Sequence, residues 1–173
     1  MTFLLGGARS GKSSLAVRLA ASSDRAVTII VTAEARDDEM AERIARHREA
    51  RPAGWTTIEA PLGLVDAVAS VPSEDAAVLD CLSIWVSNAI EAGASEDSIV
   101  EEARDTATSL AVRAAPSIVV SNEVGLGIVP VNALARRYRD VLGRVNAVAA
   151  EAATESFFVV AGRALPLQEP TLA

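Results

Sequence analysis

The sequence predicts a doubly wound α/β domain, that is, a mostly parallel sheet with helices on both faces. Short apolar runs alternate along the chain with longer segments of helical periodicity. The apolar runs are mostly continuous Val, Ile, Leu and Phe, as in strands that are covered on both faces. The first of these runs leads directly into the glycine-rich stretch Gly6–Ser13. Together these observations favour a nucleotide-binding sheet with its ligand site beside that stretch.

The elements follow in order along the chain. Strands are expected at Phe3–Leu5, Val27–Thr32, Thr56–Ile58, Ala76–Leu79, Ser117–Val120 and Ser156–Ala161. Helices are expected at Lys12–Ala21, Asp37–Glu49, Leu62–Ala69, Leu82–Ala92, Ser98–Arg113 and Ala133–Ala153. Pro61, Pro72 and Pro116 mark connections, and the tail from Pro166 to Ala173 is expected to be a frayed or surface-laid end.

Length and composition limit the possibilities. With 173 residues and 50% hydrophobic content, residues 1–173 are expected to form a single domain with an ample core. A net charge of −7 argues against a general nucleic-acid-binding surface. The sequence has no run of 18 uncharged apolar residues and no secretory leader pattern, which predicts a cytoplasmic protein without a membrane span. Cys81 is the only cysteine and is expected to pack as a small hydrophobe.

The stretch Gly6-Gly7-Ala8-Arg9-Ser10-Gly11-Lys12-Ser13 matches the phosphate-loop pattern G-x-x-x-x-G-K-[ST] at every constrained position. Its glycines let backbone N–H groups approach phosphate oxygens, Lys12 can reach the β- and γ-phosphates, and the Ser13 hydroxyl can bind Mg²⁺. Lys12 is the only lysine, since the other 15 basic residues are arginine. The alternative is a plain glycine-rich connection between a strand and a helix.

Asp80 ends a buried strand, where a carboxylate can hold Mg²⁺ beside the serine of the phosphate loop. The alternative is that Asp80 caps the helix that follows. Glu59 ends a shorter strand before Pro61. It can accept hydrogen bonds from a sugar hydroxyl or a base edge, or it can cap the next helix, and the local sequence does not distinguish these roles.

His47 is the only histidine of the chain. Steps of three and four residues place Met40, Ile44, His47 and Arg51 on one face of the predicted helix. Spacing alone favours a structural histidine. The functional alternative is a nucleophile for a nucleotide phosphate, whose charge the neighbouring arginines would neutralise.

The segment from Ser121 to Pro130 follows another buried strand. In a parallel sheet the carboxyl ends of the strands border the ligand crevice, so this loop should overlook the phosphate loop. Its two glycines and its proline are compatible with a loop that closes on a substrate and equally with a simple connection.

Several stretches together resemble the bifunctional adenosylcobinamide kinase / adenosylcobinamide-phosphate guanylyltransferase family of cobalamin biosynthesis. The resemblance covers essentially the whole chain. It rests on GGARSGKS at Gly6–Ser13, the run Val31–Trp55, Glu59-Ala60-Pro61, LDCLSIWVSN at Leu79–Asn88, VSNEVGLGIVP at Val120–Pro130, and the stretch Arg136–Gly143. Val131 departs from the family pattern, which usually has an acid there.

The resemblance implies a RecA-like P-loop NTPase fold, a trimeric assembly with sites near subunit boundaries, and a two-step enzyme. In the first step ATP or GTP phosphorylates adenosylcobinamide. In the second, GTP guanylylates a histidine that matches His47, and the GMP passes to adenosylcobinamide phosphate to give adenosylcobinamide-GDP. The matching residues for nucleotide binding are Gly6, Gly7, Ala8, Arg9, Ser10, Gly11, Lys12, Ser13, Val31, Thr32, Ala33, Arg48, Glu49, Ala50, Arg51, Glu59 and Asp80.

With Mg²⁺ as cofactor, Ser13 and Asp80 are the expected metal ligands, and His47 and Lys12 the expected catalytic residues. Two other functions compete with this one: a small P-loop kinase without a covalent intermediate, and a nucleotide-dependent switch protein without transfer chemistry. His47 distinguishes them, because only the two-step enzyme requires it as a nucleophile.

Overall fold

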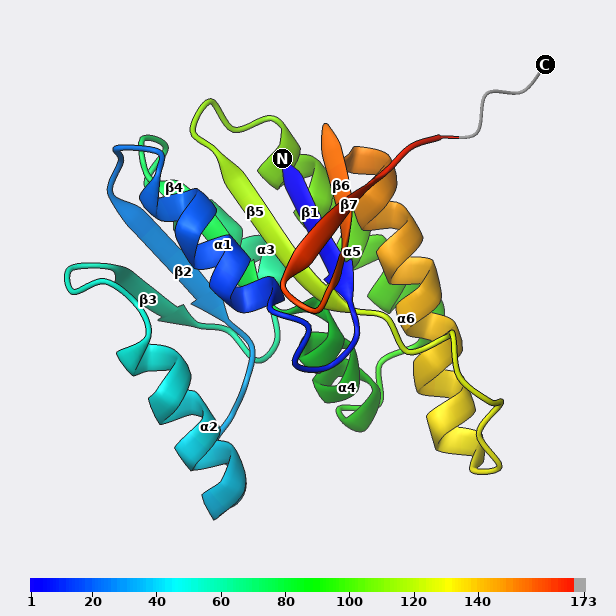
Figure 1. Ribbon diagram of the computed structural model, residues 1–173. Coiled ribbons are helices and arrows are strands. Elements are labelled where there is room, and N and C mark those ends of the chain that lie inside the picture. The colour runs from blue at the N-terminus through cyan, green and yellow to red at the C-terminus, as the bar shows by residue number, and fades with distance from the viewer. Residues whose placement is uncertain (170–173) are drawn as a thin grey trace.

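The computed structural model describes residues 1–169, apart from the side chain of Arg43. A seven-stranded sheet forms its centre (Figure 1), in the order β3-β2-β4-β5-β1-β6-β7. The strands are β1 (Thr2–Gly6), β2 (Val27–Val31), β3 (Thr56–Glu59), β4 (Ala76–Asp80), β5 (Ser117–Asn122), β6 (Glu155–Val160) and β7 (Arg163–Leu167). Neighbouring strands pair in parallel except β7, which pairs antiparallel with β6.

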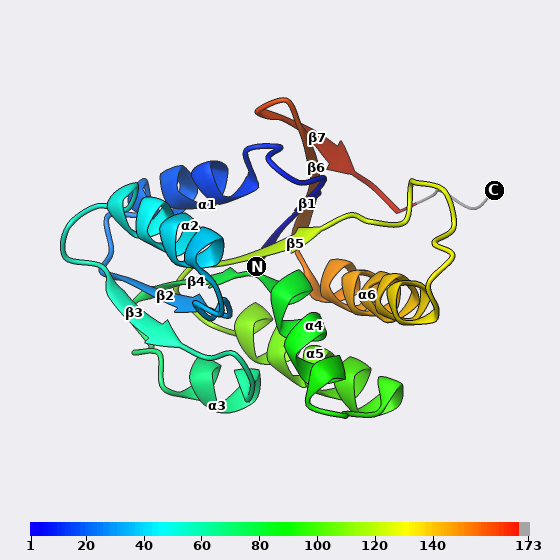
Figure 2. The same ribbon diagram turned by 90° about the horizontal axis from the view of Figure 1, so that it is seen from below.

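Helices lie on both sides of this sheet. Figure 2 shows α1 and α2 on one side and α3 to α6 on the other. The helices are α1 (Lys12–Ala21), α2 (Asp38–Glu49), α3 (Leu64–Ala69), α4 (Leu82–Glu91), α5 (Glu96–Ala111) and α6 (Ala133–Ala152). None of the helices within residues 1–169 is long and apolar enough to cross a lipid bilayer.

Side chains of the central strands alternate between two apolar clusters, because successive residues of a strand point to opposite faces. Phe3 and Leu79 pack with Trp85 and Leu142 in the cluster under α4 and α6. The next residue, Leu4, packs with Ala16 of α1 in the second cluster. Both faces of the central strands are therefore buried, which explains their continuous apolar sequences and confirms the predicted fold class.

The last strand was missed by the sequence analysis. Pro166 and Leu167 belong to β7 and pair with Phe157 and Ser156 of β6. Of the two alternatives predicted for the end from Pro166, a frayed end is therefore wrong for these two residues, whereas a surface-laid end agrees with their exposure. Proline is tolerated there because β7 is an edge strand with all of its residues exposed. Residues 170–173 of the predicted tail lie outside the described part of the chain.

Two helix starts also differ from expectation. Ser95 caps α5 by accepting a hydrogen bond from the backbone N–H of Ser98, so this helix begins earlier than predicted. The start of α3 is set by Gly63, which has a left-handed backbone at φ 67°, and by the Glu102 side chain, which accepts a hydrogen bond from the N–H of Leu64 (2.8 Å). A cap supplied from another helix leaves no local signal in the sequence.

Candidate active site

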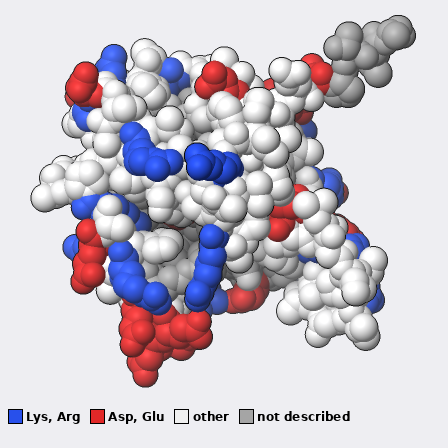
Figure 3. All heavy atoms as spheres, in the orientation of Figure 1, with Lys and Arg blue, Asp and Glu red and all other residues white. Residues whose placement is uncertain are grey.

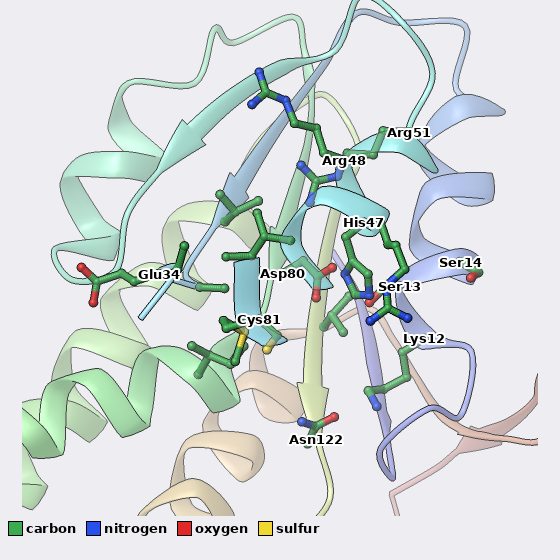
Figure 4. Close-up of a pocket in the computed structure, with 18 of the residues that line it drawn as sticks. Lys12, Ser13, Ser14, Glu34, His47, Arg48, Arg51, Asp80, Cys81 and Asn122 are labelled. Carbon is green, nitrogen blue, oxygen red and sulfur yellow. The ribbon is translucent and has the colours of Figure 1, made fainter. Parts of the chain in front are cut away.

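A pocket of about 960 Å³ opens at the carboxyl edge of the sheet, between the phosphate loop and α2. Figure 4 shows Lys12, Ser13, His47 and Asp80 around this one cavity. The predicted site residues that line it are Arg9, Ser10, Gly11, Lys12, Ser13, Val31, Ala33, His47, Arg48, Arg51, Glu59 and Asp80. Residues far apart in the sequence therefore meet at the edge where a parallel sheet binds its ligand.

The phosphate loop links β1 to α1 with a compact backbone. Gly11 is the N-cap of α1 and has φ 100°, a conformation that an L side chain rarely adopts. The Lys12 ammonium donates hydrogen bonds to the carbonyls of Gly6 (2.8 Å) and Gly7 (2.7 Å), and its side chain is buried. The amino end of α1 thus faces the pocket with a lysine held inside the loop, the arrangement that suits a bound phosphate.

Gly6 is required by close packing against the neighbouring strand. A Cβ atom at Gly6 would overlap the carbonyl oxygen of Val159 in β6. Gly6 also accepts a hydrogen bond from the backbone N–H of Glu123 (2.9 Å), just beyond β5. Gly6, the first residue of the motif, is therefore held between β6 and the end of β5, which fixes the position at which the phosphate loop begins.

Asp80 ends β4, and Ser13 lies in the first turn of α1, which follows β1 through the phosphate loop. Both residues line the same pocket although β5 separates β4 from β1 in the sheet. Hydroxyl and carboxylate oxygens are ligands that Mg²⁺ prefers, and Mg²⁺ usually takes one or two protein ligands with phosphates and water. Among residues 1–169, no group of three or more His, Cys, Asp or Glu side chains forms a metal cage on its own. The donor set therefore fits a Mg²⁺ ion that arrives with a nucleotide.

The helix α2 carries His47 to the opposite wall of the pocket. Asp37 caps this helix by accepting a hydrogen bond from the N–H of Met40 (2.7 Å). Met40, Ile44, His47 and Arg51 all line the pocket, as their spacing predicted for one helix face. The His47 side chain is exposed within it, and so is accessible to a ligand.

The pocket gathers positive charge on an acidic protein. Five basic residues and four acidic ones line it, against a net charge of −7 for the chain: Arg9, Lys12, Arg46, Arg48 and Arg51, with Glu34, Glu39, Glu59 and Asp80. Figure 3 shows basic side chains on both sides of a hollow, with acidic side chains below it. Burial lowers the pKa of the Arg51 guanidinium, and the nearby Asp80 carboxylate partly opposes that shift. Such a concentration of arginine suits a polyanionic ligand.

Comparison with known proteins identifies the family. Residues 2–167 match the family model described as cobinamide kinase / cobinamide phosphate guanyltransferase. The chain belongs to this family. It is 43% identical to the bifunctional adenosylcobalamin biosynthesis protein CobP of Pseudomonas aeruginosa over 95% of each chain. It is 39% identical to CobU of Salmonella typhimurium over 94% of this chain and 96% of that protein, and 37% identical to CobU of Escherichia coli over the same shares.

Membership confirms the enzyme class that the resemblance implied, a bifunctional cobinamide kinase and guanylyltransferase. A solved structure of a prototypical ATPase from the type III secretion system of pathogenic bacteria is also similar. Its TM-score is 0.54 at 8% sequence identity, covering 91% of this chain and 50% of that one. This likeness bears on the fold alone and agrees with the expected P-loop NTPase fold.

Some residues that match the family pattern do not line the pocket. They are Gly6, Gly7, Ala8, Thr32, Glu49 and Ala50. Thr32 is fully buried, and its hydroxyl donates to the carbonyl of Cys81 (2.8 Å) while accepting from the Cys81 N–H (3.0 Å). Thr32 therefore ties the end of β2 to the end of β4 behind the pocket, whereas nucleotide contact by these residues stays a prediction.

The structure decides the capping alternatives left open by the sequence. The N-cap of α4 is Cys81 and that of α3 is Gly63, neither with a side-chain cap bond, so Asp80 and Glu59 do not serve as N-caps. Cys81 is buried in the apolar cluster under α1, as expected, and its sulfur lies 3.0 Å from the Ser83 hydroxyl. Both acids are left facing the pocket.

Of the loop Ser121–Pro130, only Asn122 lines the pocket, and the loop then leads away to α6. The carbonyl of Asn122 accepts a hydrogen bond from Asn146 of α6 (3.1 Å), whose other amide atom accepts from Ser121 (2.6 Å). Asn122 was not singled out as a site residue. The signal that identified Asp80, a polar residue at the end of a buried strand, also applies to Asn122.

Proposed function

We propose that the chain phosphorylates adenosylcobinamide with ATP or GTP and then transfers GMP from GTP, through His47, to adenosylcobinamide phosphate. The product of the second step is adenosylcobinamide-GDP. The observation that carries this proposal is that a phosphate loop and an accessible histidine face one pocket. Two different attacks on a triphosphate, at the γ- and at the α-phosphorus, need different groups, and this pocket presents both.

For the kinase step, the acceptor hydroxyl oxygen attacks the γ-phosphorus and its proton passes to solvent. The bond from the γ-phosphorus to the bridging oxygen breaks, and the nucleoside diphosphate leaves. Such transfers depend on positioning and on neutralisation of charge. Lys12 and the N–H groups at the start of α1 hold the phosphates in this proposal. Ser13 and Asp80 would hold Mg²⁺, which supplies charge neutralisation at the phosphate oxygens when it is bound.

For the guanylyl step, an imidazole nitrogen of His47 attacks the α-phosphorus of GTP. A P–N bond forms, the bond to the bridging oxygen breaks, and pyrophosphate leaves. A phosphate oxygen of the acceptor then attacks the same phosphorus and releases the histidine. Covalent catalysis divides one difficult substitution into two steps. Arg48 and Arg51 line the same pocket as His47, where they would offset the negative charge of the phosphate groups.

We also propose that the chain assembles as a homotrimer in the cytoplasm. The loop after β5 and the start of α6 expose apolar side chains: Leu126 (81%), Ile128 (97%), Val131 (96%) and Leu134 (58%). Apolar patches of this kind mark protein–protein contacts. Light scattering should give the mass of three chains, and Ile128→Asp should lower it. A monomeric mass for the unaltered protein would contradict the trimer.

The decisive experiment follows phosphorus from GTP to the protein. Purified protein is incubated with Mg²⁺ and GTP labelled at the α-phosphorus, with γ-labelled GTP in parallel. We expect acid-labile, alkali-stable label from the α position only, because a phosphoramidate has this stability. His47→Ala should abolish the label and guanylyl transfer while phosphorylation of adenosylcobinamide stays measurable.

Glu42→Ala is the matched control, since Glu42 is exposed on α2 and does not line the pocket. It should leave labelling unchanged. Guanylyl transfer retained in His47→Ala would overturn the assignment of the nucleophile. If GTP binds without any covalent label, a P-loop kinase without a histidine intermediate becomes the better description.

A further inference from the structure

The helix α2 makes little contact with the rest of the protein. Among its described side chains none is buried, and only Met40 and Ile44 are half-buried. Figure 1 shows the helix projecting from the body of the molecule beyond the end of β2. Because packing contributes little, the position of α2, and with it that of His47, depends on the residues that attach its ends.

Arg36 directly precedes Asp37, the cap residue of α2, and attaches the amino-terminal end of α2 to the rest of the protein. Its guanidinium donates to the carboxylate of Glu34 (2.7 and 3.2 Å), to Asn88 Oδ1 (3.1 Å) and to the carboxylate of Glu91. Asn88 and Glu91 both belong to α4. These acceptors raise the pKa of Arg36, Glu34 foremost, so the guanidinium stays charged.

Asn88 provides a rigid anchor for this contact. Its side chain is 6% exposed, and its amide nitrogen donates to the carbonyls of Thr32 (2.9 Å) and Pro61 (3.1 Å). Thr32 is itself bonded to Cys81, the residue after Asp80. Hydrogen bonds therefore connect Arg36 to the ends of β2 and β4 that border the pocket.

We propose that Arg36, held by Asn88 and Glu91, is a positioning residue that sets the start of α2 and thereby holds His47 over the phosphate loop. The proposal rests on the proposed function, which makes His47 the nucleophile. Arg36 itself touches neither nucleotide nor acceptor in this role. Loss of the contact should slow guanylylation of His47, whereas the kinase step, which relies on the phosphate loop, should continue.

The size of the effect follows from geometry. An exposed ion pair contributes little to global stability, so removing it should leave the fold intact. A shift of about 1 Å in a reacting group can reduce a rate by about 100-fold. We therefore expect a selective loss of about 10-fold or more in the rate of His47 labelling.

The test compares Arg36→Ala, Glu91→Ala and the double variant with the unaltered protein. Labelling from α-labelled GTP and phosphorylation of adenosylcobinamide are measured on each. Both single variants should label about 10-fold more slowly, and the double variant should be no slower than either, because partners in one contact are not additive. The phosphorylation rate should stay within about 2-fold, and hydrogen exchange of residues 38–49 should increase.

Arg104 and Glu151 offer a matched control, an exposed ion pair (3.4 Å) that links α5 to α6. Alanine variants of that pair should change neither rate. Equal losses in both activities, additive losses, or undiminished labelling in the Arg36→Ala variant would overturn the positioning role. No label in the unaltered protein would instead overturn the proposed function, and the role given to Arg36 with it.

Discussion

The backbone N–H of Gly162 donates a hydrogen bond to the carbonyl of Ser10 (2.9 Å). The turn between β6 and β7 therefore lies against the phosphate loop, and a Cβ on Gly11 would meet the Cα of Gly162 at 3.2 Å. Ala161 and Gly162 both have positive φ, at 50° and 72°, which gives a tight hairpin turn. The carboxyl-terminal hairpin thus supports the loop that is expected to bind phosphate.

This contact predicts that Gly162→Val weakens triphosphate binding. A β-branched side chain at positive φ is strained by about 1–2 kcal/mol, so the backbone should shift and withdraw its N–H from Ser10. We expect a loss of affinity of several fold, measured by calorimetry with GTP. Gly93→Val is the control, because Gly93 also has positive φ (84°) and open space around it, but lies beyond α4. Equal losses of GTP affinity in both variants would show that the hairpin does not support triphosphate binding.

Lys12→Ala should weaken both activities, since both reactions begin with a bound triphosphate. Its ammonium lies inside the phosphate loop, 2.7 Å from the carbonyl of Gly7. Loss of a preorganised cation in such a site commonly reduces rates by about 100-fold or more. Steady-state assays of the two half-reactions measure the effect. An unchanged kinase rate would count against the role of the loop.

Asp80→Asn should raise the concentration of Mg²⁺ needed for half-maximal activity in the kinase step. The carboxylate faces the same pocket as Ser13, and an amide is a weaker ligand for a hard divalent cation. A titration with Mg²⁺ at saturating nucleotide measures the shift. Asp66→Asn, on the exposed surface of α3, should leave the titration curve in place. Identical curves for all three proteins would exclude Asp80 as a ligand.

Cys81 should react slowly with iodoacetamide in the native protein. Burial, with the nearby Asp80 charge, raises the pKa of its thiol. At a pH between the pKa of the unfolded chain and that of the folded protein, the folded protein therefore keeps the thiol proton and the unfolded chain loses it. The free energy of unfolding should consequently fall as the pH rises above about 8.5, the ordinary thiol value. Mass spectrometry of alkylated protein, native and unfolded, tests this. Rapid native alkylation at pH 7 would contradict it.

Local patterns were sufficient to predict the elements that build the candidate site. The phosphate loop, the continuous apolar strands and the common face of Met40, Ile44 and His47 all follow from periodicity and residue type. Each of these signals lies within one short continuous segment: either two turns of a helix, or one strand with the loop that follows it. For the same reason, the start of α3 was not predicted, because it depends on Glu102 of another helix.

The tertiary structure decided which residues from distant segments of the chain lie next to one another. The order of the strands places β5 between β1 and β4, yet brings Ser13 and Asp80 to one pocket. Only the fold sets Gly162 against Ser10 and Arg36 against Asn88 and Glu91. Strand order and side-chain contacts of this kind depend on pairing between distant segments, whose partners no local periodicity specifies. The sequence by itself determined which chemical groups this protein presents, and the tertiary structure determined which of them line one pocket.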